Sequence, residues 1–190
     1  MSRAIWDSLL DATRSAHESN AKMSAFHSFP TDLRRQDVTP FHVPPSDLLQ
    51  NEPNLPSSLH AELRDAFVAA APHARWRETY RGTSIGSDFM DRFGCYGLIG
   101  PDAPFASDQM WGWMVYMPPQ LHYPWHHHPA EELYLSIAGQ AQFMCHGRYD
   151  EFLTGGDTSI HESNQPHATQ THENAYMALV IWRNGFDTGP

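Results

Sequence analysis

The stretch HYPWHHHPAEELYLSIAG, residues 122–139, places three consecutive histidines just ahead of a pair of glutamates and a tyrosine. On an extended strand alternate residues share a face, so His126 and His128 point to one side. After the Pro-Ala break, Glu132 and Tyr134 share a face with each other. Two imidazoles and a carboxylate at this spacing suit one divalent first-row metal ion, and they do not select among such metals. The stretch therefore predicts a metal site within a β region.

The residues that surround this stretch have the sequence pattern of short strands. From about residue 89 onward, apolar runs alternate with turns rich in Gly, Pro and Asn. Many short strands with such turns are typical of an antiparallel sandwich or a small barrel. The expected strands are WGWMVYM, LYLSIAG, QAQFMC, YDEFL, DTSI, HATQT and AYMALVIW.

The first half of the chain predicts helices and a proline-rich arm. The arm, residues 29–58, holds six of the 15 prolines, and it is expected to be an extended arm packed on the barrel or a mobile lid over its mouth. We expect one structural domain, with helices and arm in 1–88 and the barrel in 89–190. Two sets of apolar residues recur at helical spacing: Ile5, Leu9, Ala12 and Ala16, and then Leu59, Leu63, Phe67 and either Ala70 or Ala71.

Composition limits the partners and the location of the protein. The 190 residues carry a net charge of −10, from 22 acidic and 12 basic side chains, which argues against nucleic acid as a partner. No apolar run approaches the roughly 18 residues of a membrane span, and the first residues do not read as a secretory signal. We therefore expect a cytoplasmic protein without a membrane partner. Cys95 and Cys145 are expected to be buried thiols.

Two longer sequence motifs support the prediction of a metal site. The first cupin motif, HxH, three residues, Glu, six residues, Gly, is matched at His126, His128, Glu132 and Gly139. The second motif is matched at its first glycine, Gly156, and at its histidine, His167. The chain departs from the two motifs at Gln120, Glu162, Asn164 and Thr171, which stand where the motifs have Gly, Pro, Gly and Asn. The motifs predict a mainly β cupin barrel (a double-stranded β-helix, or jelly roll) with an N-terminal α-helical extension.

Within the cupins, HYPWHHHPAEELY resembles the dimethylsulfoniopropionate (DMSP) lyases of the DddQ-like branch, found in marine bacteria. The resemblance implies that His128, Glu132 and His167 bind the metal and that Tyr134 is the catalytic base, on the metal or beside it. It also implies that Tyr123, His126 and Trp182 lie in the substrate pocket. His126 is a metal ligand in the general cupin motif, and both assignments stay open.

The implied reaction is a β-elimination that cleaves DMSP to dimethyl sulfide and acrylate. The implied cofactor is one divalent ion, with Fe, Mn, Zn, Ni and Co left open, and a homodimer is also left open. Two alternatives are a metal-dependent cupin oxygenase and a non-enzymatic cupin that binds a small carboxylate or betaine, because the cupin fold by itself does not set an activity.

Overall fold

The computed structural model describes residues 2–78 and 86–186. Its helices are α1 (Ser2–Ser19), α2 (Ala21–Phe26), α3 (Pro44–Gln50), α4 (Ala61–Ala70), the 3-10 turn η1 (Ala71–His73) and α5 (Ser87–Met90). Its strands are β1 (Arg34–Arg35), β2 (Gly94–Ile99), β3 (Phe105–Ala106), β4 (Trp111–Met117), β5 (His122–His126), β6 (Glu131–Cys145), β7 (Tyr149–Thr154), β8 (Thr158–His161), β9 (His167–Gln170) and β10 (Tyr176–Arg183).

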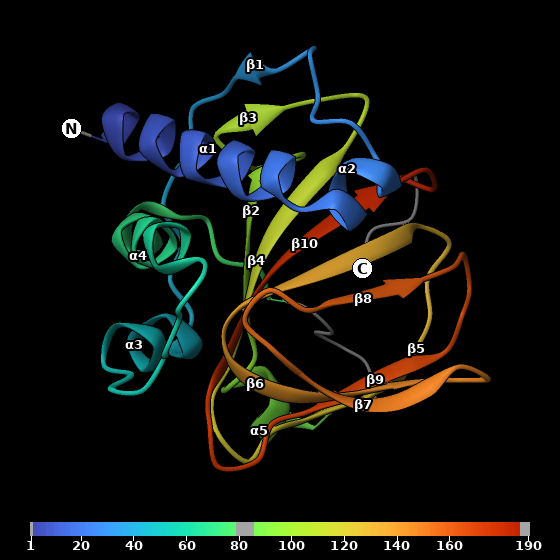
Figure 1. Ribbon diagram of the computed structural model, residues 1–190. Coiled ribbons are helices and arrows are strands. Elements are labelled where there is room, and N and C mark those ends of the chain that lie inside the picture. Colours follow the sequence, from blue (N-terminus) through green and yellow to red (C-terminus); the bar gives the residue numbers. More distant parts are fainter. Residues whose placement is uncertain (1, 79–85, 187–190) are drawn as a thin grey trace.

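The strands form one strongly bent sheet in the order β1-β3-β2-β4-β10-β6-β9-β5, with β7 and β8 also pairing with β6. Strand β6 makes the bend. Its first half pairs with β10 and β8, and its second half pairs with β7 and β9. LYLSIAG and QAQFMC are therefore one 15-residue strand rather than the two that were expected. The arrangement confirms the prediction of a mainly β cupin barrel with N-terminal helices (Figure 1).

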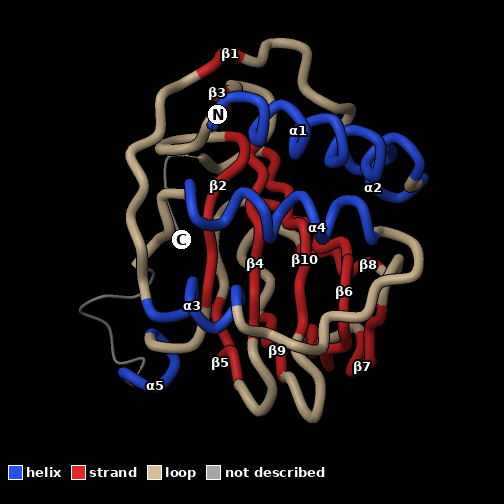
Figure 2. The backbone as a smooth tube through the Cα atoms, turned by 90° about the vertical axis from the view of Figure 1, so that its left-hand side faces the viewer, coloured by secondary structure: helices blue, strands red, loops and turns tan. Residues whose placement is uncertain are grey.

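The sheet buries both of its faces, which explains why its central strands read as continuous apolar runs. Along β10, Met177, Leu179 and Ile181 pack in one core with the helices, while Ala178 and Val180 pack in a second core inside the barrel. Figure 2 shows α1, α3 and α4 laid over strands β2, β4, β10 and β6. The helices thus cover one face of the sheet and leave the inner face for the site.

The helix predictions are confirmed over most of their length. Helix α1 buries Leu9, Ala12 and Ala16, and α4 buries Leu63 and Phe67. Leu59 was wrongly assigned to the second helix. It lies ahead of α4 and is 70% exposed.

The proline-rich arm is not extended throughout, because it contains β1 and α3. Pro44 and Pro45 begin α3, where their missing N–H groups cost no hydrogen bond. The arm is tied to the sheet: the Gly139 N–H donates to the Pro56 carbonyl, and the Ser57 hydroxyl donates to the Ile137 carbonyl. No described residue of the arm lines the pocket described below, so the structure gives the lid hypothesis no support.

Of the remaining sequence expectations, both cysteines are buried free thiols. Among the described helices, none has the length and apolar character that a membrane span needs. The division at residue 88 stays a prediction.

The cupin turns keep a glycine-like backbone where the chain lacks glycine. Gln120 and Asn164 stand at two motif glycine positions, and both adopt left-handed φ values, 58° in each case. Such a backbone costs most L residues about 1–2 kcal/mol, and Asn tolerates it best. At these two positions the residue type departs from the motif, while the backbone keeps the left-handed φ that a glycine adopts readily.

Gly139, by contrast, cannot be replaced, which gives a test of the fold. Its φ is +71°, and a Cβ there would lie 1.8 Å from the Ala175 carbonyl oxygen on the neighbouring turn. Gly147 has a similar φ, +78°, with open space around it. We expect Gly147→Ala to cost about 1–2 kcal/mol of unfolding free energy, and Gly139→Ala to cost clearly more, measured by urea denaturation. Equal losses in the two variants would contradict the steric argument.

Candidate metal centre

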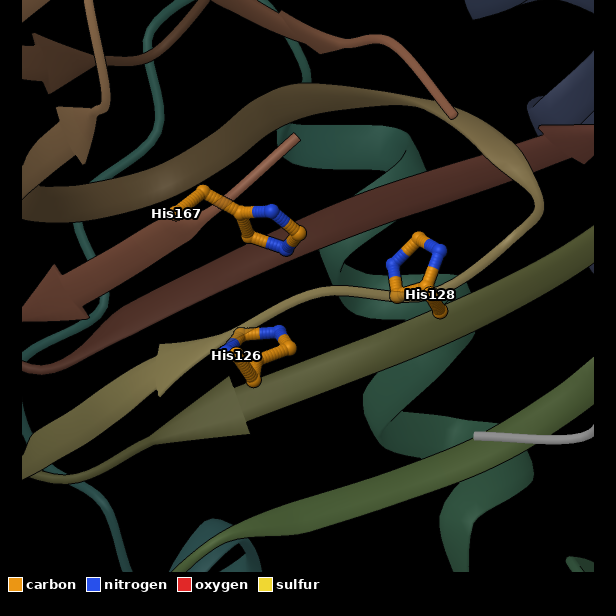
Figure 3. A group of neighbouring side chains, drawn as sticks. All are labelled: His126, His128 and His167. Atoms are coloured by element: carbon orange, nitrogen blue, oxygen red, sulfur yellow. The ribbon is translucent and has the colours of Figure 1, made fainter. Parts of the chain in front are cut away.

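Two histidines two residues apart, His126 and His128, meet the distant His167 inside the barrel. His126 ends β5 and is paired in register with His167, the first residue of β9, while His128 follows β5. Each offers one ring nitrogen, and these nitrogens lie within 4.8 Å of one another. Figure 3 shows the three side chains around a common space. The prediction that His126 and His128 face the same side is therefore confirmed.

Backbone carbonyls orient all three rings in the same way. The Nδ1 atoms of His126, His128 and His167 lie 2.8, 2.9 and 2.8 Å from the carbonyl oxygens of Pro124, Ala130 and Gln165. A carbonyl only accepts, so each Nδ1 carries the hydrogen. In the neutral ring the lone pair is then left on Nε2. This arrangement presents histidine to a metal ion.

Glu132 lies at the centre of the cluster, with its side chain 2% exposed. Its Oε2 lies 3.2 Å from His128 Nε2, and its Oε1 lies 2.8 Å from His167 Nε2. The indole N–H of Trp182 donates to Oε2 at 2.9 Å. A carboxylate so deeply buried needs partners, and here nitrogen atoms surround both of its oxygens.

These surroundings set the charges of the cluster. Burial raises the pKa of Glu132, but the facing histidines, His167 first, outweigh burial and hold that pKa well below its usual range. Burial, helped by the neighbouring His167, lowers the pKa of His126 to about 3. The His128 pKa is raised, because its hydrogen bond to Glu132 outweighs the effect of burial. The ionised Glu132 and the neutral His126 have the protonation state that metal ligands require, whereas the raised pKa of His128 means that a bound metal ion would displace a proton from that ring.

One close contact in the cluster requires a positive charge between its two atoms. His167 Nε2 is buried and makes no hydrogen bond, although it lies 2.8 Å from Glu132 Oε1. With the His167 hydrogen on Nδ1, a nitrogen lone pair and a carboxylate oxygen face each other. Two acceptors at that distance repel unless a positive charge lies between them, and that charge is supplied either by a second proton on the His167 ring or by a metal ion. Ligands that share one ion at about 2.0–2.2 Å lie about 3–3.5 Å apart, and the 3.2 Å between His128 Nε2 and Glu132 Oε2 falls in that range.

A fourth histidine, His161, was missed by the sequence analysis. It is fully buried at the end of β8, and its Nδ1 lies 2.7 Å from Glu132 Oε1. Burial lowers its pKa. The only sequence signal was its place among the many histidines of this region. Its position opposite Glu132 depends on the pairing of β8 with β6, which no motif reveals.

The remaining predicted residues surround a hollow of about 390 Å³, part of it open to solvent. Tyr134 lies two residues after Glu132 on the same strand and is 5% exposed. The Tyr123 ring stacks on the His126 ring at 4.0 Å. His127, which lies between two of the proposed ligands in the chain, is exposed. The hollow is lined by Phe93, Cys95, Trp113, Val115, Tyr123, His126, His128, Glu132, Tyr134, Val180 and Trp182.

Comparisons with known proteins agree with this picture. A family model described as dimethylsulfoniopropionate lyase matches residues 8–178. The DMSP lyase DddQ of Ruegeria pomeroyi is 44% identical over 185 residues, which cover 97% of this chain and 92% of that protein.

Solved structures extend the likeness to the whole fold. The crystal structure of DddQ from Ruegeria pomeroyi matches with a TM-score of 0.95 at 44% identity, over 98% of this chain and 94% of that one. A chain from the crystal structures of the DMSP lyases RdDddP and RnDddQII matches with a TM-score of 0.94 at 38% identity, over 100% of this chain and 97% of that one.

Proposed function

This chain belongs to the DMSP lyase family, and we propose that His126, His128, Glu132 and His167 hold a divalent metal ion beside Tyr134, the catalytic base. The chain is a carbon–sulfur lyase that cleaves DMSP to dimethyl sulfide and acrylate. Membership of this family sets aside the oxygenase and the non-enzymatic alternatives. Fe, Mn, Zn, Ni and Co all accept imidazole and carboxylate ligands, so the identity of the ion stays open.

The observation that carries the metal proposal is the convergence of two histidine Nε2 atoms on one buried carboxylate: His128 Nε2 lies 3.2 Å from Glu132 Oε2, and His167 Nε2 lies 2.8 Å from Glu132 Oε1. The shared hydrogen bonding of the three histidines supports it, because a backbone carbonyl accepts from Nδ1 of each ring and leaves its Nε2 for the ion. When bound, the ion supplies a Lewis acid that stabilises negative charge on the substrate carboxylate.

Tyr134 is the proposed base for the elimination. Its oxygen takes the proton α to the substrate carboxylate, the C–H electrons form the new C=C bond, and the C–S bond breaks so that dimethyl sulfide leaves with its electron pair. A phenol with the usual pKa near 10 is a poor base at neutral pH. Placement beside a metal centre favours the phenolate. Tyr134 is the one tyrosine in β6, and it lies two residues from Glu132 on that strand.

The aromatic residues of the hollow suit the sulfonium end of the substrate. Cations are held by aromatic faces at about 0.5–2 kcal/mol per contact, and Tyr123 and Trp182 both line the hollow. Trp182 has a further role, since its N–H is bound to Glu132 and its ring lies 4.6 Å from that of His128. Dimethyl sulfide is uncharged, so it loses this attraction once it forms and departs.

Two neighbouring histidines give a matched test of the metal centre. His128→Asn removes a proposed ligand, while His127→Asn changes the adjacent, exposed residue. We expect chelated wild-type protein to release no dimethyl sulfide into the headspace, and at least one of the five metals to restore its release. We expect the His127 variant to bind as much metal per chain as the wild type and the His128 variant to bind much less. Full lyase activity in metal-free protein would exclude the proposal.

A further inference from the structure

His161 is a buried polar residue to which neither the motifs nor the reaction gives a role. It is directly opposite Glu132 in the register of β8 and β6. Its Nδ1 lies 2.7 Å from Glu132 Oε1, and its Nε2 lies 2.7 Å from the hydroxyl of Ser159, which is also buried. Both ring nitrogens are therefore engaged.

This pattern separates His161 from the other three histidines. In those rings a backbone carbonyl takes Nδ1 and leaves Nε2 facing the common space. His161 instead turns Nδ1 toward the carboxylate and has Nε2 bound to a side chain. It has no lone pair to offer a metal ion, although its ring nitrogen lies within ligand distance of Glu132 and His167.

The hydrogens along this chain of contacts can be assigned. An ionised carboxylate only accepts, so His161 Nδ1 carries a hydrogen and donates it to Glu132. In the neutral ring Nε2 then accepts, and the Ser159 hydroxyl donates to it. The direction of donation runs from Ser159 through His161 to Glu132.

The ring of His161 also contacts a second proposed ligand. It stacks on the ring of His167 with centroids 3.9 Å apart and planes 17° apart. One side chain thus touches Glu132 through its edge and His167 through its face. Such contacts behind a metal ligand fix its orientation, and their loss usually costs 10–100-fold in metal affinity.

We propose that His161 is a positioning residue of the lyase: its Nδ1–H fixes the carboxylate of Glu132 while its ring face fixes the imidazole of His167. This inference rests on the metal centre proposed above. The hydrogen bond is the larger contribution, because it satisfies a buried charge.

Two substitutions separate the hydrogen bond from the stacking. His161→Phe keeps a flat ring against His167 and loses the N–H. His161→Asn places an amide N–H close to the Nδ1 position and loses the ring. We expect the Phe variant to bind Zn²⁺ or Mn²⁺ about 10–100-fold more weakly than the wild type, measured by competition with a chelator. We expect the Asn variant to recover the larger part of that loss.

The control is His172→Phe, since His172 is exposed and bonds to Gln142 outside the site. Its metal affinity should equal that of the wild type. Wild-type affinity in the Phe variant would overturn the inference, and so would an Asn variant as weak as the Phe variant, because packing alone would then explain the loss. If the wild type itself binds none of the five candidate ions, the metal centre fails rather than the role of His161. Circular dichroism of each metal-free variant checks that it is folded.

Discussion

Replacing Tyr134 by phenylalanine is expected to lower kcat for DMSP cleavage by about 10²–10⁴-fold, the usual contribution of a general base. The substitution removes one oxygen and leaves the ring in place. That ring packs edge-on against Phe143 with centroids 5.2 Å apart, and it lies 5.7 Å from the ring of His161. Because these contacts persist, the variant should remain folded and keep its metal, and KM should change far less than kcat.

Tyr176→Phe is the matched control for this variant. Tyr176 is a second buried tyrosine of the inner barrel core, and its hydroxyl bonds to that of Ser136 at 2.8 Å rather than lining the hollow. Its loss should cost about 1 kcal/mol of stability, as for one buried hydrogen bond, and leave kcat unchanged. Headspace assays of dimethyl sulfide, with the metal content measured on the same samples, give both results. A Tyr134→Phe variant with wild-type kcat would assign the proton transfer to another group.

Most of the proposed metal ligands can be predicted from the sequence, because residues two apart on a strand point to the same side. His126 and His128 are two residues apart, as are Glu132 and Tyr134, and each pair shares a side without any knowledge of the fold. Joining His167 to them needed the cupin motif, since β9 pairs with β5 although strands β6, β7 and β8 lie between the two in the chain. The family resemblance identified the activity, which spacing alone could not.

What the sequence could not supply are the contacts made between strands. The bonds from Trp182 and His161 to Glu132 depend on β10 and β8 flanking β6 on its two sides. The unbroken strand β6 was hidden because Gly139 looks like a turn residue, whereas here it allows close approach of the Ala175 carbonyl. Pairing register is set by the packing of the whole barrel, so it is absent from any local pattern.

Glu132→Gln is expected to weaken metal binding by more than about 100-fold, beyond the loss expected for a group that only orients a ligand. The amide keeps the shape of the carboxylate but removes its charge and turns one acceptor into a donor. His161 donates to Oε1 at 2.7 Å and Trp182 donates to Oε2 at 2.9 Å. Whichever way the amide is turned, its NH₂ group meets one of these N–H groups, and a buried donor is left without an acceptor.

Glu131→Gln tests whether this effect is local. It removes the same charge one residue earlier, on the opposite face of β6, where Glu131 pairs with Arg183. The pair is partly exposed, so its loss should cost at most about 1 kcal/mol of stability and leave metal affinity unchanged. Metal affinity, measured by chelator competition, and the release of dimethyl sulfide should therefore both fall in the Glu132 variant, and neither should fall in the Glu131 variant. The two variants have the same net charge and differ only in which face of β6 has lost its carboxylate. Equal losses of metal affinity in both would therefore mean that the overall negative charge of the chain attracts the ion.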